Sequence, residues 1–203
     1  MKKKPFWRRV NRGFVVSMAL LAVVAVYVLV TQLMLLPDKN AVRSLADDVC
    51  ALAENVSMLS EEEIASLQDP AALEAKKAEI REQLKPLFVE GSDYLEEAAE
   101  YFYSLLTMQT TGMQQVDTRG EVVRNDSSCQ LEEDTASVSI DRQYKGSHGK
   151  FWDYKTEAAE EGDADESLGV SIVFKKAGGT WKIYRIGNLY MNAYTGMGYH
   201  VVY

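Results

Sequence analysis

Hydrophobic and polar positions divide this chain into an apolar run near its start and a longer amphipathic remainder. From Phe14 to Leu36 the sequence holds 23 residues without a single charge. At about 1.5 Å of rise per residue, a helix of that length spans about 34 Å, which is enough to cross a hydrocarbon core of about 30 Å. The pattern therefore predicts a transmembrane helix over residues 14–36.

The charges that flank this run predict its orientation. Six basic and no acidic residues precede it, namely Lys2, Lys3, Lys4, Arg8, Arg9 and Arg12. Basic flanks stay on the cytoplasmic side, so we expect residues 1–13 in the cytoplasm and everything after the helix outside it. A cleaved signal peptide is the alternative. It would need a shorter apolar core and a pair of small residues before the cleavage point, which Leu33–Pro37 lacks. We expect an uncleaved, single-pass anchor in the cell membrane.

A helix is predicted to begin near Ala41, with Asp38 or Asn40 as its cap. Its apolar positions follow spacings of three and four, at Val42, Leu45, Val49, Leu52, Val56 and Leu59. One interpretation is a heptad seam that joins two copies as a parallel homodimer. The favoured interpretation is a helix packed on its own domain, because the flanking residues Ala46 and Ala53 are small and widen the apolar stripe.

Shorter helices are expected next. Residues Ser60–Glu63 form a capping box, in which the serine and the glutamate satisfy each other's backbone N–H groups. Asp69-Pro70 predicts the start of another helix, since proline at the first helical position gives up no hydrogen bond. Pro86 should end that helix, and residues 37–91 together read as a helical, membrane-proximal region. A further amphipathic helix begins at Ser92-Asp93.

After Gly112 the period of the pattern changes to two, which is typical of strands. Residues 114–124 and 128–144 are predicted as paired strands. The turn-forming residues Asn125-Asp126-Ser127 are expected to connect them.

A second hairpin is predicted over residues 170–186, where apolar and polar residues alternate on both sides of Gly178-Gly179. Between the two hairpins, residues 145–167 read as an exposed, acidic connection. Gly146–Gly149 is expected to be a loop there, with a short helix near Lys155–Glu160.

Helices followed by an antiparallel sheet predict an α+β fold, with residues 92–203 as its outer domain. The closing hairpin reads Gly178-Gly179-Thr180-Trp181-Lys182-Ile183-Tyr184. On that hairpin and the order of elements, residues 92–190 resemble the cone-shaped, cystatin-like domains of the nuclear-transport-factor-2-like superfamily. The resemblance implies a curved sheet that wraps a long helix and encloses a pocket. That superfamily includes enzymes, binding proteins and membrane-anchored assembly factors of bacterial secretion machines, so it leaves the function open.

The charge balance of the outer part narrows the choice of partner. Residues 38–203 hold all 30 acidic residues and 16 of the 22 basic ones, a net charge of −14. So acidic a surface repels nucleic acid and anionic lipid, and a nucleic-acid partner is not expected.

The cysteines and histidines do not form a recognisable metal or catalytic motif. Cys50 and Cys129 both follow the anchor, where an oxidising compartment permits a disulfide, but the sequence leaves their pairing open. Together with His148 and His200 they lack the short spacings of a zinc site. His148 is interpreted as an exposed loop residue; to act as a general base it would need an acid and a pocket beside it.

Two other segments were weighed as binding sites. Asp163-Ala164-Asp165-Glu166-Ser167 alternates acids but lacks the glycine and glutamate of a calcium loop, so no metal site is predicted. The end of the chain is rich in tyrosine and methionine, at Tyr184, Tyr190, Met191, Tyr194, Met197, Tyr199 and Tyr203. This end is either a contact surface for a partner or a final strand packed on the sheet.

These observations predict a membrane-anchored binding or assembly module on the outer side of the membrane. No catalytic, cofactor or metal motif is present in the sequence, and no enzymatic activity is expected. The partner would be a protein or a small ligand. The alternatives are a subunit of a secretion or conjugation machine, or an enzyme whose pocket uses scattered groups such as His148.

Overall fold

A computed structural model describes residues 12–153 and 156–194 of the chain. It divides into two compact units, residues 1–40 and residues 41–203. Helix α1 (Arg12–Val56) begins in the first unit and continues into the second. The predicted helix start at Ala41 is therefore wrong. The helix nevertheless passes through Pro37. The proline removes one backbone hydrogen bond, and the helix propensity of the leucines before it offsets part of that loss.

The described part of the first unit is an apolar helix whose side chains are mostly exposed. Most of its large apolar side chains from Phe14 to Leu36 are between 46% and 75% exposed, and Leu35 is half-buried. Among the described residues, this is the one helix long and apolar enough to cross a membrane.

The second unit begins with helices that pack on a sheet. They are the end of α1, α2 (Glu61–Ser66), α3 (Pro70–Leu84), the 3₁₀ turn η2 (Lys85–Leu87) and α4 (Tyr94–Thr110). The capping box is present, since Ser60 accepts from the Glu63 backbone and Glu63 accepts from the Ser60 backbone. Asp69 caps α3, with proline at the first helical position. Both predicted helix starts are confirmed.

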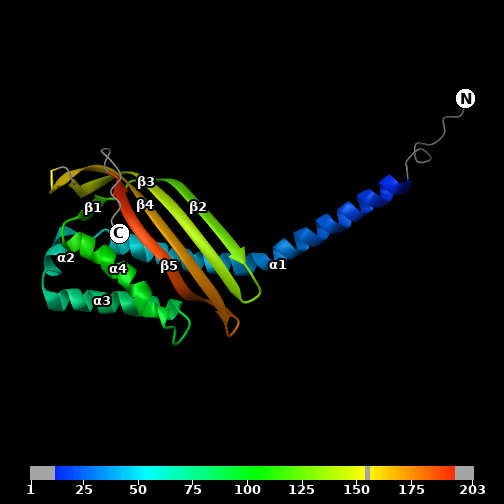
Figure 1. Cartoon of the computed structure of the whole chain (residues 1–203), viewed down its shortest axis with the longest axis horizontal. Coiled ribbons are helices and arrows are strands. Elements are labelled where there is room, and N and C mark those ends of the chain that lie inside the picture. Colours follow the sequence, from blue (N-terminus) through cyan, green and yellow to red (C-terminus); the bar gives the residue numbers. More distant parts are fainter. Residues whose placement is uncertain (1–11, 154–155, 195–203) are drawn as a thin grey trace, which may run out of the picture. The chain divides into compact units, whose positions relative to one another are not determined.

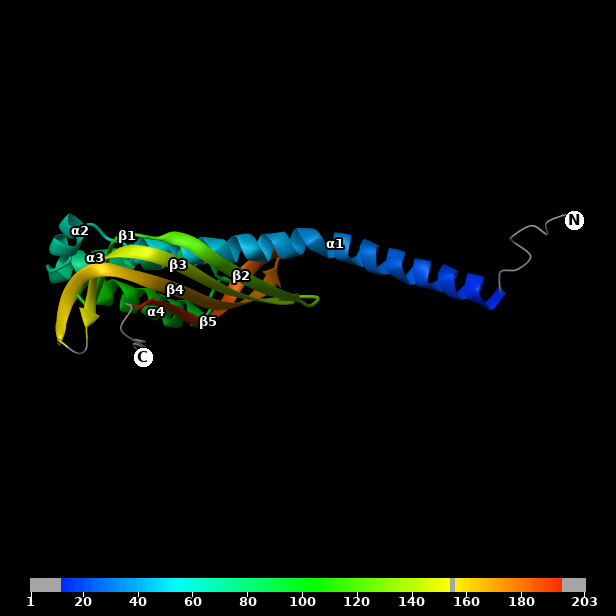
Figure 2. The same ribbon diagram turned by 90° about the horizontal axis from the view of Figure 1, so that it is seen from above.

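Five antiparallel strands form one sheet. They are β1 (Gln114–Thr118), β2 (Glu121–Leu131), β3 (Thr135–Asp153), β4 (Ala158–Ala177) and β5 (Thr180–Tyr194). The order is β1-β3-β4-β5, and β2 also pairs with β3, beside the stretch that β1 leaves free. Helices α3 and α4 lie side by side along the sheet (Figure 1), and the long strands bend along their length (Figure 2). The α+β class and the curved antiparallel sheet are confirmed.

Two details of the predicted sheet are wrong. Residues Asn125–Ser127 do not turn but lie within β2, opposite Arg142, Asp141 and Ile140 of β3. Their turn propensity is overridden by the ladder to β3, and the connection falls instead at residues 132–134.

The predicted acidic connection over 145–167 is also mostly strand. β3 runs on to Asp153 and β4 begins at Ala158, so Gly146–Gly149 are strand residues. Of the predicted helix over Lys155–Glu160, residues 158–160 are strand, residues 156–157 form a turn, and Lys155 lies outside the described residues. The reason is that period-two alternation continues through Asp163–Glu166, where Asp163 and Asp165 are exposed while Ala164 and Glu166 are buried. Gly146, with φ of +76°, supplies the irregularity that shifts the register between Tyr144 and Ser147.

One hydrophobic core joins the helices to the sheet. From α1 it includes Val42, Ala46, Val49, Cys50, Ala53 and Val56, all buried. The heptad positions of α1 therefore face the domain's own core, as the favoured interpretation predicted. Across from them lie inward residues of β3 and β4 such as Val138, Ile172 and Phe174.

Candidate functional site: a groove beside strand β5

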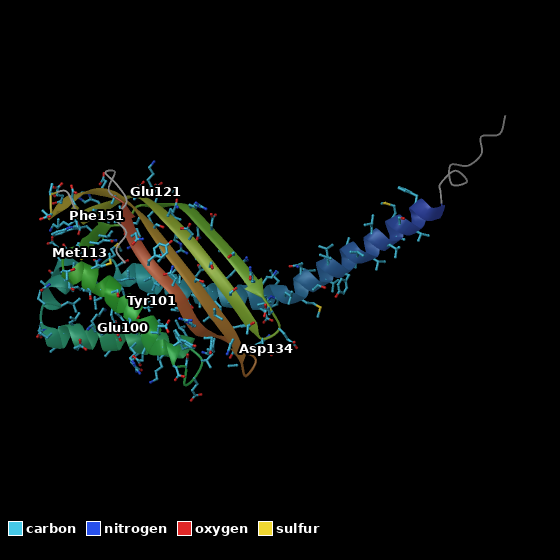
Figure 3. The ribbon with its side chains drawn as sticks, in the orientation of Figure 1. Glu100, Tyr101, Met113, Glu121, Asp134 and Phe151 are labelled. Atoms are coloured by element: carbon cyan, nitrogen blue, oxygen red, sulfur yellow. The ribbon has the colours of Figure 1, made fainter. Side chains whose placement is uncertain are left out.

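A groove of about 910 Å³ lies between α4 and β5. Its lining comes from Lys77 on α3, from α4, from Met113 and from residues 188–192 of β5. Figure 3 marks three of the lining residues, Glu100 and Tyr101 on α4 and Met113 just beyond its end. Buried residues, Leu105, Leu189 and Met191, form its base.

The groove runs along the open edge of β5. Residues 188–192 are five consecutive positions of one strand, and all of them line it. Side chains alternate between the two faces of a strand, so five neighbours can share a groove only if it runs along their backbone edge. Among the described residues, no strand pairs with that edge. Its outward N–H and C=O groups are therefore available to another chain.

The preceding stretch of the same edge is already covered. Phe88 bridges Ile183 in parallel, and the N–H of Val89 donates to the Ile183 carbonyl at 2.9 Å. The hydroxyl of Ser92 donates to the Tyr184 carbonyl at 3.2 Å. The protein's own chain thus contacts this edge through one isolated bridge at Phe88 and through Ser92, on either side of a turn at Glu90-Gly91.

Tyr101 closes the groove at the end nearest Gly187. Its hydroxyl donates to the carbonyl of Gly187 at 3.1 Å, which links α4 to β5. The hydroxyl of Tyr103 donates to the carbonyl of Lys77 at 3.2 Å and holds α3 beside α4. Burial, followed by the nearby carboxylates Glu96 and Glu100, raises the pKa of Tyr103, so this donor stays protonated at neutral pH.

Aromatic and thioether side chains give the groove its chemical character, through Tyr101, Tyr103, Met108, Met113, Tyr190 and Met191. Tyrosine offers a large amphipathic surface, and methionine adapts to irregular shapes, so both suit contacts with a peptide. The sequence indicated contact chemistry near the C-terminus, but missed the α4 side of the groove.

A buried polar cluster, called here the Glu166 cluster, lies next to Met191 and contains Glu166, Arg119, Gln114, Ser147 and Ser57. The Glu166 carboxylate accepts from Ser147 at 2.5 Å and from Arg119 and Gln114 at 3.3 Å each. Arg119 donates onward to Ser57 at 2.8 Å and to the backbone carbonyl of Glu54 at 3.0 Å, which connects the sheet to α1.

A second polar contact joins α1 to β3. Arg142 pairs with Glu54 and lies 3.2 Å from Asp47, while the Tyr144 hydroxyl donates to Glu54 at 2.5 Å. Burial, with the Glu54 carboxylate next, raises the pKa of Tyr144 and keeps it a donor. In both clusters the charged groups bind one another, so they hold α1 on the sheet and leave no carboxylate poised for acid–base chemistry.

The residues weighed from sequence do not come together as a site. His148 lies on β3 rather than in a loop, and its Nδ1 lies 2.9 Å from Asp163; the side chain is exposed. Asp163 and Asp165 face solvent while Glu166 points into the core, and the described residues contain no group of metal-ligating side chains. Cys50 and Cys129 are free thiols.

Only part of the tyrosine-rich end of the chain lies within the described residues. Tyr184, Tyr190 and Met191 belong to β5, with Met191 buried, as the packing interpretation predicted. Met197, Tyr199, His200 and Tyr203 lie outside the described residues. The sequence analysis missed Glu166, although the alternation along the strand could have indicated it. Alternate residues of a strand face the same side, and Ala164, Leu168 and Val170 on the same side as Glu166 are all buried.

No family model matches the sequence, and no curated protein is similar to it. Among solved structures, the chain is similar to the crystal structure of a putative calcium/calmodulin-dependent protein kinase II association domain from Xanthomonas campestris. The match has 15% sequence identity and a TM-score of 0.28, and covers 62% of this chain and 78% of that one. At that identity and TM-score the match carries no argument about fold family or function.

Proposed function

We propose that this protein is a membrane-anchored domain that binds an extended segment of a partner protein on the outer side of the membrane. The carrying observation is the groove that follows five consecutive residues of the open β5 edge. An incoming segment would add as a strand to β5, in the mode known as β-augmentation.

The contacts divide naturally between affinity and selectivity. Backbone groups of residues 188–192 would hydrogen-bond to any extended peptide, whatever its sequence. Alternate side chains of that peptide would turn towards α4, where Met108, Leu105 and Tyr101 favour apolar or aromatic groups. Beside the groove, the Val89 N–H already donates to the Ile183 carbonyl of β5, so backbone groups on this edge do accept hydrogen bonds from outside the sheet.

The anchor in this proposal is residues 14–36, with residues 1–13 in the cytoplasm. The six basic residues before the helix and their absence of acidic neighbours support that orientation. A test is to label a cysteine at Ser128 or at Lys3 with a membrane-impermeant maleimide, in a Cys129→Ser background. Labelling of Ser128→Cys in intact cells, and of Lys3→Cys only after lysis, is expected. The reverse pattern would exclude the orientation.

The groove itself is tested by photocrosslinking in native membranes. A photoreactive amino acid at Asn188 should trap one defined partner, and the same group at Ser139, on the exposed face of β3, should not. A Ser104→Trp substitution fills the groove from an exposed position of α4 and should abolish the crosslink, whereas Ala78→Trp on α3 should leave it intact. Equal crosslinking at Asn188 and Ser139 would reject the proposal.

The identity of the trapped partner decides a further point. A stoichiometric partner that is itself a component of a secretion or conjugation machine would identify this chain as a subunit of that machine. We propose no catalytic activity, because the buried carboxylate of Glu166 is already held by Arg119, Ser147 and Gln114.

A further inference from the structure

The chain continues from strand β5 directly beside the groove. The groove follows residues 188–192, and the described part of β5 ends two residues later, at Tyr194. In the sheet, β5 is the last strand of the order β1-β3-β4-β5, and α4 lies next to it (Figure 1). Residues 195–203, which lie outside the described part of the chain, are therefore attached close to the open edge.

This segment differs in composition from the rest of the outer part of the chain. From Ile186 to Tyr203 the sequence has 18 residues without an aspartate, glutamate, lysine or arginine, although residues 38–203 carry a net charge of −14. The run Tyr199-His200-Val201-Val202-Tyr203 is rich in the β-branched and aromatic residues that favour strands. A neutral strand-forming segment that is left exposed pairs with other chains, so its composition favours a covered position.

The residues that precede this run are typical of a tight hairpin. Gly196-Met197 places glycine at the first central position of a two-residue loop, as a type II′ turn requires. A loop of that length fixes the register of the hairpin, and it sets Tyr199 opposite Tyr194 and Val201 opposite Asn192. The returning strand then runs antiparallel to β5, as in every other strand pair of the described sheet.

We propose that residues 198–203, called here the tail strand, fold back along the open edge of β5 and cover residues 190–192 of the groove until a partner segment displaces them. This inference rests on the proposed function, because it concerns access to the same site. Directly opposite residues of an antiparallel pair face the same side of the sheet. Val202 lies opposite the buried Met191 and so faces the helices, where Leu105 lines the groove.

The short loop makes the tail strand a strong competitor for the groove. A segment attached through so short a connection is present at its site at an effective concentration on the order of millimolar. A partner must therefore offer the same backbone pairing and side chains that fit the groove at least as well. We expect that partner to be an extended, neutral segment with β-branched or aromatic residues at alternate positions, as in the tail strand itself.

Disulfide trapping in the full-length chain, in native membranes, tests the fold-back. The background is Cys129→Ser, with buried Cys50 left in place. Under mild oxidation Asn192→Cys/Val201→Cys should form an intramolecular disulfide, because directly opposite residues lie within bonding range. The matched pair Asn192→Cys/Val202→Cys places its thiols on opposite faces and should not. Mass spectrometry of the digested chain identifies the linked peptides. Equal linking in both pairs, or linking in neither, would overturn the tail strand.

The same variant tests the regulation. With a photoreactive amino acid at Asn188, the oxidised Asn192→Cys/Val201→Cys chain should lose most of its partner crosslink, and a reductant should restore it. Deletion of residues 195–203 should instead raise the crosslink several-fold, and circular dichroism checks that this variant is folded. Equal crosslinking in all three forms would overturn the regulation and leave the proposed function standing. A 192–201 disulfide with no partner trapped in any form would reject the proposed function and support the tail strand.

Discussion

The carboxylate of Glu166 accepts a hydrogen bond from Nε of Arg119 at 3.3 Å, and the side chain of Glu166 is completely excluded from solvent. Glu166 stands on β4, whereas Arg119 follows β1 and reaches the carbonyl of Glu54 on α1. This pair ties three elements together next to the base of the groove, where Arg119 also lies 3.6 Å from the sulfur of Met191. The fold thus depends on a buried charge pair at the place where the proposed ligand would bind.

Removing the charge of Glu166 should lower the free energy of unfolding substantially. In Glu166→Gln the guanidinium of Arg119 stays nearly buried without its counter-charge, and breaking a buried pair in this way costs about 3 kcal/mol. Urea denaturation of the full-length protein in detergent micelles would measure the loss. Glu160→Gln, an exposed carboxylate on the same strand, is the control and should change little. If Arg119→Met added to Glu166→Gln recovered none of the loss, the charge pair would not be its cause.

The two cysteines should differ in reactivity. Burial raises the pKa of Cys50 to about 12. Because the thiolate is the reactive form, Cys50 should resist thiol reagents at pH 8 in the native protein, and Cys129, which is partly exposed, should react. Titration with a chromogenic disulfide should count one thiol before unfolding and two after it. Two native thiols would contradict the buried position of Cys50.

The same thiol should contribute a pH dependence to stability. Its pKa is raised from 9.0 in the unfolded chain to about 12 in the folded one. Below pH 9 both states are protonated and the full stability is present. As pH rises from 9 towards 12, the unfolded chain loses this proton first, so unfolding becomes more favourable. Comparing denaturation at pH 8 and pH 10 for the unmodified chain and Cys50→Ala should show a smaller fall in the variant.

His148 should titrate above its ordinary value. The hydrogen bond to Asp163, with a contribution from Glu161, raises the pKa of this exposed histidine above 6.5. The contact therefore favours the folded state below pH 6.5 and loses its effect as pH rises through the raised pKa. An NMR titration of the imidazole would measure it. Asp163→Asn should lower the pKa, while Asp165→Asn, two residues along the same strand, should lower it less. No response to Asp163→Asn would show that the contact is absent in solution.

Met191 should be needed for the fold rather than for partner capture. Its side chain is 1% exposed, and its sulfur accepts a hydrogen bond from the hydroxyl of Ser57 at 2.8 Å. Replacing a buried methionine by alanine costs about 2–5 kcal/mol, so Met191→Ala should lower the midpoint of urea denaturation clearly. A deletion of residues 191–203 removes this side chain with the end of β5 and should destabilise the domain. Truncations that test partner binding should therefore begin after Tyr194. A deletion of 191–203 with unchanged stability would contradict this role.

Local rules predicted much of the helical part correctly. The Ser60 capping box, the Asp69-Pro70 start and the hairpin at Gly178-Gly179 each depend on residues close together in the chain. Local rules failed where long-range pairing outweighed propensity. Asn125–Ser127 looks like a turn but lies in β2, because each of its residues has a partner on β3.

The candidate site was mostly beyond prediction from sequence. The groove combines α4 with residues 188–192, which are about 80 positions away, so no local spacing records their proximity. Glu166 was the exception. It occupies an inward position among Ala164, Leu168 and Val170, and an acid in a buried period-two series marks an ion pair or a site.

By itself, the sequence determined that residues 14–36 are a charge-free stretch of membrane-spanning length, that helices precede an antiparallel sheet, and where several of those elements start. These properties follow from hydrophobic runs, periodicity and capping, which act over a few residues. Only the tertiary structure decided that α1 continues through Pro37, that Glu166 pairs with Arg119, and that, within the described part of the chain, no strand pairs with the β5 edge beside the groove. Those outcomes depend on contacts between segments far apart in the sequence, which form only when the whole sheet is in place.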